Sequence, residues 1–207
     1  MSGWSGKNRT NHSRVFQGRD ELGTVLVTIT YVQQTSPDDL KPAAVPDGDV
    51  RVVRAEETSP EFHRYFYLSV GGDWLWNGRR DWNWDQWEAH ASRPGVELWA
   101  LWVRGTPAGY AVLRAVDNDV EIENFGLLPS FIGRGLGGHL LTEVVRRAWA
   151  IEGTTRVLLN TCSLDGPHAL RNYEARGFVP YRTEQEERSD KDGVARGPWD
   201  GANRVPR

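Results

Sequence analysis

The stretch VEIENFGLLPSFIGRGLGGHLL, Val120–Leu141, carries five glycines between Gly126 and Gly138, after an apolar run and before a helical pattern. Three of them, at 133, 135 and 138, match the G-x-G-x-x-G pattern of dinucleotide-binding loops. In those loops the first glycine directly follows a strand, and the next strand ends in an acid that binds the ribose. Here residues LLPSFI intervene and the next strand, RVLLNTCS, lacks the acid. The pattern therefore does not indicate a nicotinamide-binding fold, and without a Gly-Lys-Ser/Thr ending it is not a Walker A loop.

The glycines nevertheless predict an anion site. Successive glycines allow backbone N–H groups to point into one concavity at the start of a helix, where the helix dipole favours negative charge. A phosphate or pyrophosphate is the expected ligand. The alternative, a plain turn between a strand and a helix, would need only one or two glycines.

Hydrophobic periodicity predicts the elements around this loop. Apolar residues recur every four positions from Leu136 to Ala148, which indicates an amphipathic helix. Ser59 and Pro60 predict the N-cap and first turn of an earlier helix. Strands are predicted at 24–32, 50–55, 96–103, 108–116, 119–128, 155–163 and 178–184, and helices at 61–70, at the end of 73–91, at 136–148 and at 167–176. Tight turns join the three strands before the loop, which predicts an antiparallel meander.

The composition of this 207-residue chain favours a single soluble domain, because 39% hydrophobic residues suffice for one core. A net charge of −3 gives no overall attraction to nucleic acids or acidic membranes. The single cysteine, Cys162, excludes a disulfide framework and a cysteine metal cluster, which favours a reducing cytoplasm. No run of about 18 apolar residues occurs, so we expect no membrane span.

Two ordered motifs give the chain a family resemblance. A strand with glutamates leads into the glycine loop and an amphipathic helix, and residues 169–178 follow with the pattern A-x-x-x-Y-x-x-x-G-F. This combination resembles the GCN5-related N-acetyltransferase (GNAT) superfamily. The resemblance implies an α/β (α+β) fold, in which a mixed, mostly antiparallel sheet is flanked by helices. It also implies a V-shaped splay between two central strands, which opens a slot for the coenzyme.

The resemblance also divides the chain. It implies an acyltransferase domain at 49–188, preceded by an additional strand and a linker at 20–48. The two ends, 1–19 and 189–207, are expected to be flexible tails. The first tail is basic, with four Lys or Arg residues before the first acid.

In this family the loop amides hold the pyrophosphate of acetyl-coenzyme A (acetyl-CoA). The family pattern is usually Q/R-x-x-G-x-G/A, whereas isoleucine stands at its first position here. We expect coenzyme binding to survive this difference because backbone amides make the main contacts. The residues implied in coenzyme binding are Leu127, Leu128, Ile132, Gly133, Arg134, Gly135, Leu136, Gly137 and Gly138, with Asn160 or His168 in place of an asparagine that the family often has at Gly166.

Acyl transfer to an amine needs a base, an oxyanion donor and an acid for the leaving thiolate. Glu121 and Glu123 lie two apart on one strand and hence on one face, and Glu121 falls where several relatives have their general base. The alternative is a polar strand edge in solvent. The matching tyrosine, Tyr173, is implied as the acid, with a core tyrosine as the alternative. The Leu127 amide is implied as the oxyanion donor.

A covalent route is a further alternative. Cys162 would then be the acylated nucleophile and His168 its base. Two considerations favour direct transfer over this covalent route. Members of the family usually transfer the acyl group directly, and a single cysteine on a strand more often packs as a small buried apolar residue.

The stretch DWLWNGRRDWNWDQW, residues 73–87, contains five tryptophans. The resemblance implies that this is the segment of variable sequence that lies over the acceptor site. One interpretation is an aromatic wall for a planar or cationic acceptor, formed by Trp74, Trp76 and Trp84, with Asp73 attracting the amine. The alternative is a satellite core beneath a loop.

The leading hypothesis is an enzyme that transfers an acetyl group from acetyl-CoA directly to a primary amine of a small molecule, without a metal. One alternative uses a carrier protein or aminoacyl-tRNA as the donor, and another is a silent domain that only binds acyl-CoA. A homodimer is considered. Membranes, and nucleic acids other than tRNA, are not expected partners.

Overall fold

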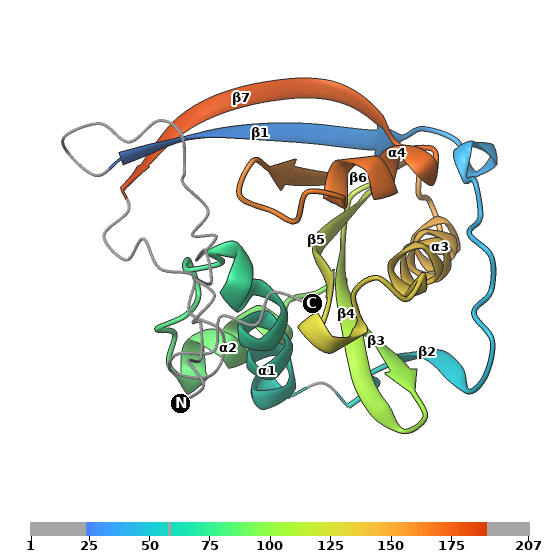
Figure 1. The fold of residues 1–207 in the computed structure, drawn as a ribbon, viewed down its shortest axis with the longest axis horizontal. Helices are drawn as coiled ribbons and strands as arrows, with labels where there is room; N and C mark the ends of the chain where they lie inside the picture. The colour runs from blue at the N-terminus through green and yellow to red at the C-terminus, as the bar shows by residue number, and fades with distance from the viewer. Residues whose placement is uncertain (1–23, 58, 190–207) are drawn as a thin grey trace, which may run out of the picture.

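A seven-stranded sheet runs through the computed structural model, which describes residues 24–57 and 59–189 (Figure 1). The strand order is β2-β3-β4-β5-β6-β1-β7, and every neighbouring pair is antiparallel except β5 and β6. The strands are β1 (Thr24–Gln34), β2 (Val50–Arg54), β3 (Val96–Val103), β4 (Thr106–Val116), β5 (Asp119–Leu127), β6 (Arg156–Cys162) and β7 (Val179–Ser189). The predicted mixed sheet and the meander β3-β4-β5 are therefore confirmed.

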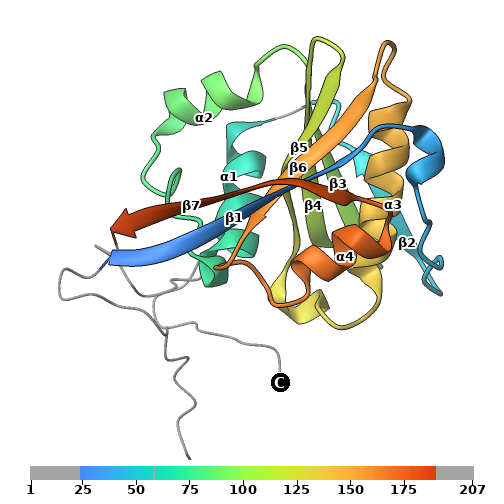
Figure 2. The same ribbon diagram turned by 90° about the horizontal axis from the view of Figure 1, so that it is seen from above.

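Helices cover both faces of this sheet: α1 and α2 lie on one face, and α3 and α4 on the other (Figure 1, Figure 2). The helices are α1 (Pro60–Gly71), α2 (Trp84–Ala91), α3 (Leu136–Trp149) and α4 (Ala169–Ala175), with short 3₁₀ turns η1 (Pro37–Asp39), η2 (Gly72–Trp74) and η3 (Pro129–Phe131). The predicted N-cap of α1 is confirmed, because the Ser59 hydroxyl accepts a hydrogen bond from the Phe62 amide at 3.2 Å.

The helix predicted at 167–176 is shorter than expected. It begins at Ala169, and the Asp165 carboxylate does not cap it. Instead, this carboxylate accepts hydrogen bonds from the Thr161 hydroxyl and the Cys162 amide, which closes a turn at the end of β6. Asp165 is thereby left beside the opening between the central strands.

Each face of the sheet has its own core. The apolar stripe of α3, including Leu140 and Val144, packs with Leu101 of β3 and Val157 of β6. On the other face, Phe66 and Val70 of α1 pack with Leu98, Ala100, Tyr110 and Val112.

The central strands β5 and β6 separate after a short contact. Only three residue pairs join them, from Asp119–Arg156 to Glu121–Leu158. A register shift in the β4–β5 ladder also leaves Glu123 without a partner on β4, which is the geometry of a β-bulge. The predicted V-shaped splay is therefore present, and Glu123 lies where it opens.

The segment before residue 49 completes the sheet. Strand β1 lies between β6 and β7 and pairs with both (Figure 2). The amide of its buried Gln34 donates to the Arg176 carbonyl and accepts from the Trp149 indole, so it joins α3 to the end of α4. The tail predicted at 1–19 lies outside the described residues, and so does the tail predicted at 189–207 except for Ser189, which is the last residue of β7. Among the helices of the described part, none is long and apolar enough to cross a bilayer.

Candidate active site

The glycine loop leads into α3 without a side-chain cap. Gly135 occupies the N-cap position with a φ of +74°, and no side chain caps the helix start. Gly133 also has a positive φ, +83°, and a Cβ at either position would meet nothing within 4 Å. The first amides of a helix have no intrahelical partners, so those of α3 are available to an external anion.

These glycines line one wall of a cavity of about 550 Å³, which we call the loop cavity. It occupies the opening of the V, with β5 on one side and β6 and α4 on the other. Its polar and small lining residues include Gly133, Gly135, Gly137, Gly138, Asn160, His168, Asn172 and Tyr173. The cavity thus brings the predicted anion loop beside the predicted acid.

Tyr173 is held by packing against aromatic rings. Its ring makes edge contacts with Phe125 and Phe178, and only 6% of the residue is exposed. Burial raises the pKa of its hydroxyl. Tyr173 therefore keeps its proton at neutral pH, and the raised pKa makes it a weaker acid toward a thiolate than an ordinary tyrosine.

A second cavity of about 610 Å³, which we call the aromatic cavity, adjoins the first. Tyr67, Trp74, Trp76 and Trp82 line it, together with Arg79. Trp87 is instead 2% exposed and packs against Trp82, while Trp84 is 57% exposed and donates to Glu61. The tryptophan stretch therefore divides into a wall, a small core and an exposed residue.

Five residues line both cavities: Trp74, Trp76, Glu123, Asn160 and Asp165. A molecule in one cavity therefore meets a molecule in the other beside these side chains. This junction contains two carboxylates with different surroundings.

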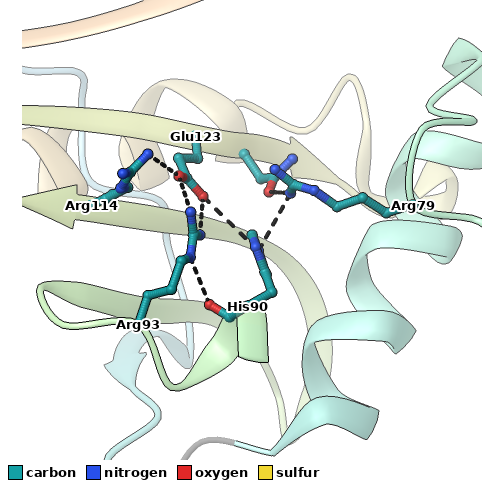
Figure 3. Close-up of polar contacts among 6 residues, drawn as sticks. Arg79, His90, Arg93, Arg114 and Glu123 are labelled. Carbon is teal, nitrogen blue, oxygen red and sulfur yellow. Dashed lines mark hydrogen bonds and ion pairs between the residues drawn. The ribbon is translucent and has the colours of Figure 1, made fainter. Parts of the chain in front are cut away.

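Glu123 is tightly paired at the junction. Arg93 donates to both of its oxygens, at 2.9 and 2.7 Å, and Arg114 lies 3.4 Å from one of them (Figure 3). Burial alone would raise the pKa of this carboxyl, but the hydrogen bond and charge of Arg93 outweigh it and lower the pKa. Glu123 is therefore ionised at neutral pH.

Two buried histidines, His63 and His90, lie next to the pair formed by Glu123 and Arg93. Burial, aided by the charges of Arg79 and Arg93, lowers the pKa of His90 to about 3, and the pKa of His63 is lowered to about 4 for the same reasons. Their rings pack edge to face, 5.7 Å between centroids. Both are neutral at pH 7, so neither offsets the charge of Glu123.

Asp165 has the opposite arrangement, with hydrogen bonds but no cation. It accepts from the Thr161 hydroxyl at 2.7 Å, the Cys162 amide at 2.9 Å and the Trp76 indole at 3.3 Å. In the described part of the chain no Lys, Arg or His forms an ion pair with it.

Several predicted site residues lie at neither cavity. Glu121 lines neither, although burial and the charge of Glu123 raise the pKa of its carboxyl toward the range of a general base. Leu128 and Leu136 pack into the cores. Arg134 stacks over Phe131 beside a smaller hollow next to β2. Asp73 and Trp84 also lie outside both linings, so Trp74 and Trp76 alone represent the predicted acceptor wall.

The alternative nucleophile, Cys162, lines the aromatic cavity, whereas His168 lines the loop cavity. Burial raises the pKa of the Cys162 thiol, followed by the charge of Asp165. Because a thiolate is the reactive form, this environment disfavours covalent catalysis.

Five residues of this site were not predicted from the sequence: Arg79, Arg93, Asn124, Asp165 and Asn172. Arg79 lies in the tryptophan stretch, and its position between the aromatic residues was the available signal. Asp165 lies just before the helix predicted at 167–176, and no local pattern distinguishes it from a residue at a helix start. No local pattern marks Arg93 or Asn124, which reach Glu123 and Arg79 only through the tertiary fold.

The family model for the acetyltransferase (GNAT) family matches residues 55–178, more than half of the chain. The chain belongs to the GNAT acetyltransferase family. The matched segment contains the splayed strands, the glycine loop and both cavity-lining helices, α1 and α4. Strands β1, β2 and β7 extend beyond it.

Solved structures share this fold. A GCN5-related N-acetyltransferase from Kribbella flavida is 21% identical with a TM-score of 0.59, over 84% of this chain and 62% of that one. A GCN5-related N-acetyltransferase from Sphaerobacter thermophilus is 16% identical with a TM-score of 0.58, over 78% and 52%. A functionally unknown conserved protein from Staphylococcus epidermidis is 20% identical with a TM-score of 0.56, over 81% and 63%.

The GNAT chain thus spans less than two thirds of the length of these structures, and at such identities the likeness shows the fold alone. No protein of curated function matches the sequence. The acyl donor and the acceptor must therefore be argued from the two cavities.

Proposed function

We propose that this GNAT protein transfers an acetyl group from acetyl-CoA directly to a primary amine of a small molecule. The observation that carries the proposal is the meeting of two cavities at the open V, one beside an uncapped helix start and one lined by aromatic rings. The first suits a pyrophosphate, and the second is the right size for a small acceptor.

In the reaction, the amine nitrogen forms a bond to the thioester carbonyl carbon. The carbon–sulfur bond then breaks, the amide forms, and the thiolate takes a proton. Tyr173 lines the loop cavity with its proton retained, which supports it as the donor. The attacking amine must also lose a proton.

Glu123 is the carboxylate we propose for that proton, because it lines both cavities. Its lowered pKa makes it a weak base. The arginines that cause this also disfavour a cationic amine nearby, since like charges lower the pKa of an ammonium group. Glu121 remains the alternative general base: its pKa is raised, which suits a base, but it lines neither cavity.

Titration calorimetry with acetyl-CoA, free coenzyme A and NAD tests the donor. We expect micromolar binding of both coenzyme A forms and none of NAD. A screen of small amines for thiol release and for the acetylated product then tests the reaction. If neither coenzyme A form binds, the family membership describes the fold alone, and donors carried by proteins or tRNA become the better explanation.

A further inference from the structure

Arg79 presents an unneutralised positive charge to the aromatic cavity. Its guanidinium donates to the Asn124 carbonyl oxygen at 3.0 Å and lies 3.4 Å from the His90 ring nitrogen. Asn124 is uncharged, and the lowered pKa of His90, about 3, keeps that ring neutral as well. No carboxylate of residues 24–57 and 59–189 forms an ion pair with Arg79.

Aromatic rings hold this guanidinium in place. It lies 5.7 Å from the centroid of the Tyr67 ring and 5.3 Å from that of Trp82, which are cation–π distances. The backbone amide of Arg79 also donates to the Tyr67 hydroxyl at 3.3 Å. The charge is therefore positioned before any ligand arrives, and binding an anion there needs little reordering.

Asp165 supplies a negative charge with no ion-pair partner among the described residues, where the same cavity meets the loop cavity. The Trp76 indole nitrogen donates to Asp165, and the Trp76 ring contacts Tyr67 at 5.5 Å between centroids. The guanidinium of Arg79 lies over the Tyr67 ring. Two aromatic side chains thus lie between the two charges and form a continuous wall.

Neighbouring charges do not cancel this pattern. Glu123 is bound directly by Arg93 and Arg114, although the charge of Arg79 also lowers its pKa, and Arg188, on the β7 side of the cavity, is paired with Glu186. The aromatic cavity therefore has an anionic group, Asp165, where it meets the loop cavity, and a cationic group, Arg79, that lines the aromatic cavity alone.

We propose that the acceptor is an amine that carries a carboxylate at its opposite end. Its ammonium group binds at Asp165, beside the loop cavity. Its chain or ring lies against Trp76 and Tyr67, and its carboxylate pairs with Arg79. The choice of reacting end rests on the proposed acetyltransferase function, whereas binding of the carboxylate by Arg79 does not.

Matched acceptors test this assignment. The probes are para-aminomethylbenzoate and para-methylbenzylamine, which differ in the carboxylate, together with aminohexanoate and hexylamine as a flexible pair. With acetyl-CoA as the donor, we expect the acid of each pair to have a kcat/KM roughly tenfold to a hundredfold higher, as one charged hydrogen-bonded contact provides. Arg79→Met should bring this ratio to about one, and Arg79→Lys should retain part of it.

Arg64→Met is the control, because Arg64 is exposed on α1 and lines neither cavity. It should keep the wild-type ratio. Equal use of the acid and the neutral amine, or a preference that persists in Arg79→Met, would overturn the inference while leaving the acetyltransferase function in place. Thermal melting verifies that each variant is folded.

Calorimetric titration of the acids without acetyl-CoA separates this inference from the proposed function. If acetyl-CoA is not a donor and no probe is acetylated, binding of para-aminomethylbenzoate that is lost in Arg79→Met still supports the carboxylate site. If neither acid binds to the wild-type protein, with or without acetyl-CoA, the inference is wrong.

Discussion

Glu121 and Glu123 lie two residues apart on β5, yet their surroundings move their pKa values in opposite directions. Burial and the neighbouring charge raise the pKa of Glu121, whereas Arg93 lowers that of Glu123. Position and basicity, the two properties of a general base, therefore belong to different residues. Of these two glutamates, only Glu123 lines the cavities.

Replacing each glutamate by glutamine separates these properties. If contact with the amine decides, Glu123→Gln should lower kcat by about a hundredfold, the usual contribution of a general base, and Glu121→Gln by much less. Steady-state kinetics and acetyl-CoA titrations of both variants provide the measurement. A larger loss in Glu121→Gln, with coenzyme binding intact, would indicate that Glu121 acts through water.

The buried histidines predict a pH dependence of stability. Their folded pKa values, about 4 for His63 and about 3 for His90, lie below the unfolded value of about 6.5. As the pH falls below 6.5, the histidines of the unfolded chain bind protons while those of the folded protein stay neutral. The free energy of unfolding therefore decreases. We expect it to be roughly 4 kcal/mol lower at pH 5 than at pH 7, about 2 kcal/mol from each histidine, measured by urea denaturation.

Variants assign this effect to the histidines. His90→Gln should reduce the difference between pH 5 and pH 7, whatever its effect on overall stability. His168→Gln, which changes an exposed histidine, should leave the difference unchanged. An unaltered difference in His90→Gln would mean that other groups cause it.

At the scale of elements, the start of α3 has no side-chain N-cap, and its backbone angles favour glycine. Gly135 precedes the helix at φ +74°, and Gly105, in the β3–β4 turn, has a similar φ of +79°. Neither position has a neighbour within 4 Å of an added Cβ. The two glycines are therefore matched in strain and differ in their distance from the loop cavity, since only Gly135 lines it.

Alanine at these two positions separates stability from coenzyme binding. Each substitution should cost about 1 kcal/mol of unfolding free energy, because a left-handed φ disfavours a Cβ. Only Gly135→Ala should also weaken acetyl-CoA binding, by tenfold or more, since its methyl group enters the anion site. Denaturation and calorimetry give the two quantities. Equal affinities in the two variants would argue against an anion site at this loop.

At the scale of the whole molecule, β1 closes the sheet although the family model begins only at residue 55. It forms ladders with both β6 and β7, and Val27 and Val32 are fully buried. The edge of β6 that lines the cavities therefore depends on a strand from the start of the chain.

Two truncations test this dependence. Removal of residues 1–34 deletes β1 and should abolish cooperative unfolding, because β6 and β7 lose their shared partner. Removal of residues 1–19, which lie outside the described residues, should leave both the melting temperature and small-amine acetylation unchanged. Circular dichroism melting and the amine assay provide the readouts. A cooperative fold without β1 would contradict this account of the sheet.

Most elements were predictable because their determinants are local. The Ser59-Pro60 cap, the four-residue spacing from Leu136 to Ala148 and the turns of the meander depend on residues within a few positions of one another. The glycine loop and its place before α3 follow from the same kind of information. Strand β7 is longer than predicted because pairing with β1 extends it to Ser189.

The sequence by itself determined the family, the splayed sheet, the glycine loop before α3 and the neighbourhood of Tyr173, since each rests on an ordered local motif. Only the tertiary structure decided which side chains meet at the junction. The pairing of Glu123 with Arg93, which follows α2, and the charges of Arg79 and Asp165 on one aromatic wall join residues that are 30 to 86 positions apart. Contacts of that separation depend on how the helices and strands pack, and no local pattern encodes them.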